Sequence, residues 1–202
     1  MSREPRPDPF AGRPDWAPHP PRPIVPMPAL NHDDLRGRRV IVGLPGLGWR
    51  CDLRADERVV QGSRTYIPVM PEHEWYRAEL EQVEVFAPLI PAEQVWVEVL
   101  GARNEIVPHD RNDMPDRLVS LDAPPRREPI AIMDVSRLTG HRVVQVVEGV
   151  ERRDLRAVTE LHTSTDGYTC ARVATELEWY RWAANGRAPK TREIPVNLLW
   201  IE

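Results

Sequence analysis

The sequence predicts a mainly β, β-rich α+β protein. We expect two tandem copies of one small β-barrel or β-sheet domain, packed as a pseudo-twofold pair, with a proline-rich tail at the N-terminus. Three observations predict this. The tetrapeptide Glu-Trp-Tyr-Arg occurs twice. Short segments rich in Val and Ile are separated by Gly and Pro, as strands are. The length of 202 residues is enough for two small domains.

The duplication is indicated by several blocks that match in the same order. Glu74 to Arg77 returns as Glu178 to Arg181, a shift of 104 positions (178 minus 74). Further blocks match at nearly the same shift: Asp52 to Ala55 with Asp154 to Ala157, Ile90-Pro91 with Ile194-Pro195, and Trp96 to Glu98 with Trp200 to Glu202. Because Trp and Tyr are retained mainly for their large buried area, we interpret most matched residues as core and turn positions of a repeated fold.

The matches divide the chain into four parts. These are a tail (1–21), a first β-rich repeat (22–100), a linker (101–127) and a second β-rich repeat (128–202). A repeat of this size buries too little surface to be very stable alone. We therefore expect the two repeats to pack together or to exchange a strand.

The tail contains many prolines, which lack an amide donor and exclude a helix or a central strand. It is predicted to be extended or disordered. Phe10 and Trp16 are its aromatic residues and our candidates for binding a protein partner as a linear motif.

In the first repeat, Ile24 to Leu30 is broken by prolines and predicts an edge strand. Arg38 to Leu44 predicts a buried strand that ends at Pro45-Gly46. The glycines at 43, 46 and 48 resemble a phosphate loop, but no Lys-Ser/Thr pair follows them. A glycine-containing hairpin is the better interpretation.

Further strands are predicted in both repeats. They are Trp49 to Val60 (with a turn or bulge), Thr65 to Met70, Val83 to Phe86, Gln94 to Leu100, Ile130 to Val135, Arg142 to Val147, Asp154 to Leu161, Tyr168 to Ala174 and Asn197 to Ile201. Since Trp200 belongs to the last of them, we expect the end of the chain to be held in a sheet.

The repeated tetrapeptide fits either a helix or a hairpin. The segment that begins at Pro71 carries acids suited to a first helical turn, and Thr175 is suited to cap the second copy. Asn185-Gly186 fits a helix C-terminus as well as a type I′ turn. We favour a short helix in each repeat.

Charge, apolar content and motif spacing argue against several classes of function. The net charge of -4 argues against a general grip on nucleic-acid phosphates. No apolar run is long enough to span a membrane, and the polar N-terminus does not resemble a secretory signal, so we expect a cytoplasmic protein. Cys51 and Cys170 are not at matching positions, which favours reduced thiols over a disulfide. No histidine or cysteine spacing predicts a metal, and no motif predicts a cofactor.

The candidate surface consists of recurring charged residues together with aromatic residues: Trp49, Arg54, Tyr66, Glu74, Arg77, Arg156, Tyr168, Glu178 and Arg181. Such sets usually form ion pairs that fix a fold, although they can also supply paired acids for catalysis. We predict a non-enzymatic interaction or structural module that presents a pseudosymmetric surface to a protein partner, with self-association also open. One alternative is a nucleic-acid-binding module in which the exposed aromatics stack on bases. A second is an enzyme with a site between the repeats.

Overall fold

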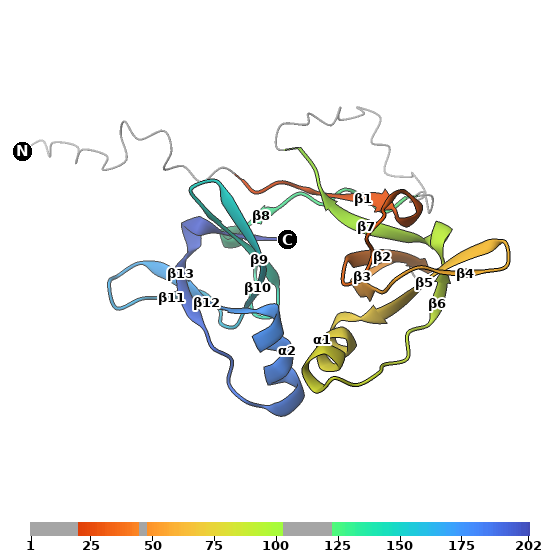
Figure 1. Cartoon of the computed structure of the whole chain (residues 1–202). Coiled ribbons are helices and arrows are strands. Elements are labelled where there is room, and N and C mark those ends of the chain that lie inside the picture. The colour runs from red at the N-terminus through yellow and green to blue at the C-terminus, as the bar shows by residue number, and fades with distance from the viewer. Residues whose placement is uncertain (1–19, 45–47, 103–122) are drawn as a thin grey trace, which may run out of the picture.

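The computed structural model describes residues 20–44, 48–102 and 123–202. These residues form two curled antiparallel sheets of seven strands each, together with two short α-helices (Figure 1). The mainly β, duplicated fold predicted from the sequence is confirmed. The predicted proline-rich tail, with Phe10 and Trp16, lies outside the described residues.

The two halves contain the same elements in the same order. The first consists of β1 (Ile24–Pro28), η2 (Ala29–Asn31), β2 (Arg39–Leu44), β3 (Gly48–Ala55), β4 (Val59–Gln61), β5 (Arg64–Pro71), α1 (Glu72–Glu81), β6 (Leu89–Pro91), η3 (Ala92–Gln94) and β7 (Val95–Leu100). The second consists of β8 (Ile130–Ala131), η4 (Ile132–Asp134), β9 (Arg142–Val147), β10 (Val150–Ala157), β11 (His162–Thr163), β12 (Thr169–Thr175), α2 (Glu176–Asn185), β13 (Arg192–Pro195), η5 (Val196–Leu198) and β14 (Leu199–Ile201).

The strand order is also the same in both sheets. The first sheet runs β1-β7-β2-β3-β5-β4, with β6 paired to β5. The second runs β8-β14-β9-β10-β12-β11, with β13 paired to β12. Each strand of one half therefore has its counterpart at the same place in the other.

Both sheets curl at the same place. The pairing of β2 with β3 shifts register between Val40 and Val42, and the pairing of β9 with β10 shifts between Arg152 and Leu155. A bulge bends a strand and increases its twist. The repeated bulge folds each sheet around its own apolar core, where Val40 and Val97 in the first half and Val143 in the second are fully buried.

The helices confirm the favoured interpretation of the repeated tetrapeptide. In α2 the Thr175 hydroxyl accepts a hydrogen bond from the Glu178 amide at 3.3 Å, and Gly186 ends the helix in the left-handed conformation. In α1 Pro71 occupies the cap position without a side-chain bond, and Gln82 adopts the left-handed conformation that Gly186 adopts in α2.

Other predictions are confirmed in outline. Trp200 pairs with both Val144 and Ala131, so the last strand lies inside a sheet. Gly43 pairs with Trp49 across an antiparallel hairpin. The two cysteines are free thiols.

Two strand predictions are wrong, and a third is displaced, because the strand predicted from Asp154 to Leu161 runs from Val150 to Ala157. Val83 to Phe86 is not a strand, because the chain leaves the sheet after α1 and rejoins β5 only where the Pro88 carbonyl accepts from the Val69 amide. The predicted strand from Ile130 to Val135 is only two residues long, because the chain turns at η4 to bury Ile132.

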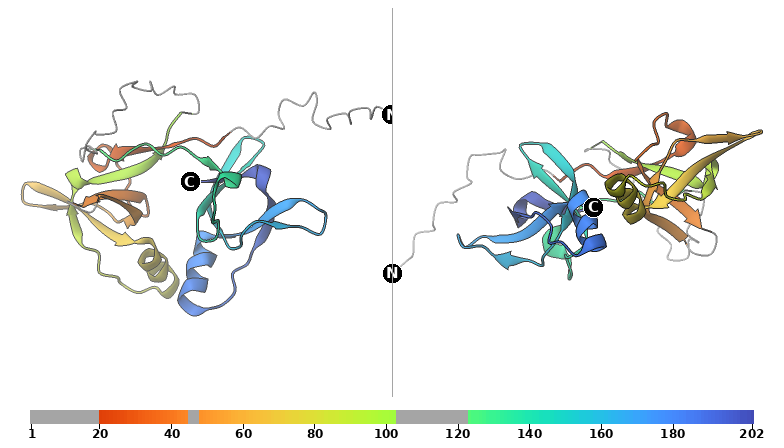
Figure 2. Two further views of the ribbon diagram at one scale, coloured as in Figure 1. Left: turned by 180° about the vertical axis from the view of Figure 1, so that it is seen from behind. Right: turned by 60° about the horizontal axis from the view of Figure 1, so that its bottom comes forward.

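The lead-in to each half touches the other half. The Ile24 and Arg127 backbones exchange two hydrogen bonds, of 2.9 and 3.0 Å, which joins the start of the second repeat to β1. The Arg22 amide donates to Glu151 of the second half at 2.9 Å. The helices α1 and α2 also pack together, and Figure 2 shows the two halves meeting along this side. The two repeats therefore pack together, as expected. The contacts described so far are one between the helices and a short antiparallel backbone pairing between the lead-in to the second repeat and β1.

No helix among the described residues is long and apolar enough to cross a membrane.

Candidate functional site at the junction of the two halves

The junction is centred on two buried glutamates. Strand β5 runs directly into α1 and β12 runs directly into α2, so Glu72 and Glu176 are each the first helical residue after a strand. Each residue is only 1% exposed. A buried carboxylate needs charged or hydrogen-bonding partners to remain ionised.

Each glutamate finds its closest partners in the other half. Glu176 accepts hydrogen bonds from Arg54 at 2.9 Å and from the Tyr76 hydroxyl at 2.8 Å. In the reciprocal arrangement, Glu72 accepts from Arg156 and from the Tyr180 hydroxyl, both at 2.9 Å. The same residue of each half contacts the same partner in the other, as in a twofold-symmetric interface.

A second arginine from the first half strengthens this network. Arg39 donates to Glu202 at 2.8 Å and to Glu176, and it lies 3.4 Å from Glu72. Burial opposes its charge, but Glu176 and Glu202 outweigh that effect, so the pKa of Arg39 is raised above its usual value. Arg39 therefore remains a partly buried cation that links three carboxylates.

Arg142 holds the equivalent position in the second half. It lies 3.2 Å from Glu72 and 3.3 Å from Glu98, and it donates to the Cys51 carbonyl at 2.7 Å. Arg127 also contacts Glu98. Burial nevertheless raises the pKa of Glu98, against the lowering effect of the two arginines.

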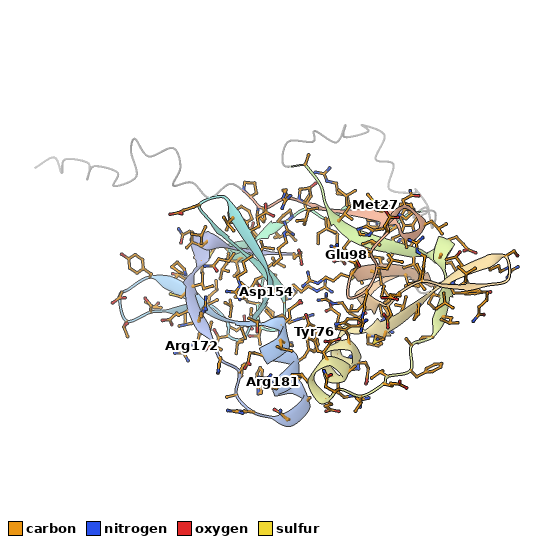
Figure 3. The ribbon with its side chains drawn as sticks, in the orientation of Figure 1. Met27, Tyr76, Glu98, Asp154, Arg172 and Arg181 are labelled. Carbon is orange, nitrogen blue, oxygen red and sulfur yellow. The ribbon has the colours of Figure 1, made fainter. Side chains whose placement is uncertain are left out.

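Two tyrosines stack where the helices meet. The rings of Tyr76 and Tyr180 lie 4.8 Å apart at an interplanar angle of 17°. Arg54 lies over the first ring at 5.4 Å and Arg156 over the second at 5.0 Å, which adds a cation–π contact on each side. In Figure 3, Tyr76 and Glu98 of the first half and Asp154 of the second lie along this junction.

The two tyrosines and Glu176 keep one protonation state each near neutral pH. Burial raises the pKa of both stacked tyrosines, and the adjacent glutamates raise it further, so the hydroxyls stay protonated and donate. Burial also disfavours the charge of Glu176, but Arg39 and Arg54 outweigh it and lower its pKa. The tyrosines thus remain hydrogen-bond donors and Glu176 remains a charged acceptor, as a structural network requires.

A cavity of about 380 Å³ opens beside the network on one side. It is lined by Ile24, Gly37, Arg38, Arg39, Arg54, Tyr76, Glu98, Leu100, Arg153, Asp154, Glu176 and Glu202. Arg38 and Arg153 stand at positions that match His141 and Cys51 of the opposite half. Arg153 is already bound to Glu202 at 2.6 Å, so the cavity wall is held by ion pairs. Within the described ranges, no group of three or more His, Cys, Asp or Glu residues is arranged to hold a metal.

The structure separates the charged residues that the sequence singled out. Arg54 and Arg156 belong to the junction. The tetrapeptide charges lie on the helix surfaces, where Glu74 pairs with Arg77 at 2.8 Å and the second copy repeats the pair at 2.6 Å, between Glu178 and Arg181.

The aromatic candidates lie apart from the junction. Tyr168 is 67% exposed beside the β11–β12 hairpin, whereas Trp49 and Tyr66 are partly buried in the first sheet. Trp49 packs against Gly43, where an added Cβ would meet its ring at 2.8 Å. Stacking of these residues on nucleic-acid bases stays a prediction.

Most of the junction was not predicted from the sequence. The missed residues are Arg39, Glu72, Tyr76, Glu98, Arg142, Glu176, Tyr180 and Glu202. All of them are polar, and each first-half residue has its counterpart at the matching position of the second half. Repetition of a charge was the pattern that could have revealed the arginines and glutamates, and the two tyrosines belong to the repeated tetrapeptide.

The two halves differ in the chain that follows each helix. We call residues 79–89 the acidic segment and residues 183–193 the basic segment; the two match at the shift of 104 (183 minus 79). Val83, Phe86 and Leu89 of the acidic segment are 44%, 89% and 40% exposed. The matching residues of the basic segment are Arg187, Lys190 and Glu193.

Comparison with known proteins identifies no relative of this chain. No protein-family model, no curated protein and no solved structure is significantly similar to this chain. The function is therefore inferred from the site itself.

Proposed function

We propose that this protein is a non-enzymatic interaction module in which two similar β-rich halves, fixed by the buried junction, present a binding surface to a protein partner. The observation that carries the proposal is the exposure of Phe86, together with Val83 and Leu89, on the acidic segment. Two free cysteines accord with a cytoplasmic location, which we also propose.

An exposed aromatic with apolar neighbours is typical of a protein-binding surface. Aromatic residues supply much of the energy at the centre of interfaces, whereas charged residues surround them. Glu79, Glu81 and Glu84 are all exposed and precede Phe86 in the same segment, so the acidic segment carries both kinds of residue.

The second half serves as an internal reference for this interpretation. If exposure of the segment were only a product of the fold, apolar residues would be tolerated equally in both copies. In the basic segment, Phe86 is replaced by Lys190 and Val83 by Arg187. The apolar surface is thus a property of one copy, and the shared fold does not require it.

The junction supports a binding role over a catalytic one. Its carboxylates are engaged by arginines and tyrosines from both halves, and the pKa of Glu176 is moved away from neutrality. Burial raises the pKa of Glu98, but Arg127 and Arg142 each hold one of its two oxygens. A general acid or base works best with a pKa near the operating pH. The network instead holds the two halves in one orientation, which gives the surface a fixed shape.

The test is site-specific photo-crosslinking in living cells of the organism that encodes the protein. A photoreactive phenylalanine analogue replaces Phe86 in one version of the full chain and Lys190, the matching position, in another. We expect a discrete protein adduct from position 86 that disappears when Val83→Ser and Leu89→Ser are added.

Circular dichroism of the purified variants checks that the fold is retained. An adduct pattern at position 86 that is no stronger than at position 190, or that is insensitive to the two serine substitutions, would contradict the proposal.

A further inference from the structure

We infer that the partner of the acidic segment is the basic segment of a second copy of this chain, and that two copies form a twofold dimer through both contacts. The inference rests on the proposed function, since it assigns a partner to the same surface. It is carried by charge complementarity between two exposed segments that lie on the same side of the molecule.

The two segments carry opposite charges that are not used within the chain. The exposed acids are Glu79, Glu81 and Glu84, and the exposed bases are Arg187, Lys190 and Arg192. Among the described residues, none of these six side chains forms an ion pair. Other charged residues on the same helices are paired, as Glu74 is with Arg77. Six unpaired charges, sorted by sign into two segments, are therefore available to an outside partner.

The pseudosymmetry places both segments where one dimer can use them together. They occupy equivalent positions on either side of the paired helices, along the lower edge in Figure 1. Consider a true twofold axis between two copies that is perpendicular to the pseudo-twofold axis and also to the line joining the two segments. Rotation about this axis places the basic segment of the second copy opposite the acidic segment of the first. The same operation brings the remaining two segments together, so both contacts are attractive.

The side chains of the two segments also complement each other in shape and polarity. Arg187 and Lys190 have long aliphatic stems, which can cover apolar surface while the charged ends remain in contact with acids and water. Phe86 offers such a surface, and its ring face attracts a cation. One pairing of the segments would thus cover Phe86 and neutralise the flanking glutamates.

The charges also disfavour the two alternative pairings of the segments. A dimer with acidic segment on acidic segment would place like charges together and lose stability, and so would basic on basic. The charge pattern therefore selects the crossed arrangement, in which every copy gives one segment of each kind.

The experiment uses two charge-reversed forms of the full chain. The first carries Glu79→Arg, Glu81→Arg and Glu84→Arg, and the second carries Arg187→Glu, Lys190→Glu and Arg192→Glu. All six positions are exposed, and basic residues at the end of α1 suit the helix dipole, so both forms should fold. Sedimentation velocity over a concentration series measures association.

We expect the wild-type chain to dimerise at low salt and to dissociate as salt is added, because exposed charges are screened. Each reversed form should dimerise at least about tenfold more weakly, since like charges then face each other. A mixture of the two forms should restore the dimer, because both contacts become attractive again. Phe86→Ser should weaken the wild-type dimer, and Asp166→Arg, on the distant β11–β12 hairpin, should leave it unchanged.

A wild-type chain that stays monomeric at low salt, or a mixture that fails to restore the dimer, would overturn the inference. The photo-crosslink at position 86 then separates the two proposals. An adduct to residues 183–193 of another copy supports both. A discrete adduct to a different protein, from a monomeric chain, overturns the dimer and leaves the proposed function standing.

Discussion

Replacing Glu176 by glutamine should destabilise the protein far more than the same change two residues later, at Glu178. The Glu176→Gln substitution keeps the shape of the side chain but removes the charge that Arg39 and Arg54 share. The Glu178→Gln substitution removes an ion pair with Arg181 on the helix surface, while the amide oxygen of glutamine can still accept the hydrogen bond from the Lys190 amide. The two substitutions lie on the same helix, so helix propensity is matched.

The expected magnitudes follow from burial. The Glu176 side chain is 2% exposed, and removing one partner of a buried ion pair costs about 3–5 kcal/mol because the other charges stay buried without compensation. A pair on a helix surface, such as the partly exposed Glu178–Arg181 pair, contributes about 0–1 kcal/mol. Since small proteins are stable by about 5–15 kcal/mol, the first loss is a large part of the total.

The pH dependence gives a second measure of the same network. The pKa of Glu176 is lowered in the folded protein, so its contribution is present above the ordinary glutamate pKa of 4.5 and is lost as the pH falls through the folded value. The difference between wild type and Glu176→Gln should therefore shrink in acid.

Urea unfolding, followed by both tryptophan fluorescence and circular dichroism, measures these differences. Coincident transitions are needed to treat unfolding as two-state. If Glu176→Gln and Glu178→Gln destabilised the protein equally, the carboxylate at the junction would not be what holds the two halves together.

Three further substitutions test local features. Gly37→Ala should destabilise the protein more than Gly62→Ala in urea unfolding. Both glycines have positive φ, which costs an alanine about 1–2 kcal/mol, but only at position 37 would the added Cβ lie 3.2 Å from the Trp75 ring. Equal losses would show that contact with the Trp75 ring does not contribute. Thr175→Ala should destabilise by about 1 kcal/mol through loss of the helix cap, and no change would show that its bond to the Glu178 amide is not formed in solution. The pKa of His162 should lie above its usual value because it hydrogen-bonds Glu193 at 2.6 Å, so this pairing stabilises the fold below pH 6.5 and is lost as the pH rises through the folded pKa. Glu193→Gln should lower that pKa in an NMR titration, and an unchanged titration would contradict the pairing.

The sequence predicted the duplicated fold well because its information is local and repeated. The Thr175 cap and the Gly186 terminus predict α2 without reference to the rest of the molecule. The strand from Arg39 to Leu44 follows from its Val and Ile content. These features depend on neighbours in the chain, and the second copy provides an independent check of each.

The junction could not be predicted in the same way, because its bonds join residues far apart in the sequence. Nothing near Arg54 indicates that its carboxylate partner is Glu176, 122 positions later. The strand prediction for Val83 to Phe86 failed for a related reason. Alternating apolar residues ordinarily indicate a buried strand face, but here they lie on the surface after α1.

The reciprocal glutamates also bear on how the chain is made. During translation the first half leaves the ribosome before Glu176 has been added, so Arg54 and Tyr76 meet water in place of their closest carboxylate. The nascent first half then lacks part of the network that stabilises it. We expect it to acquire its full protection from proteolysis only after the second half has emerged.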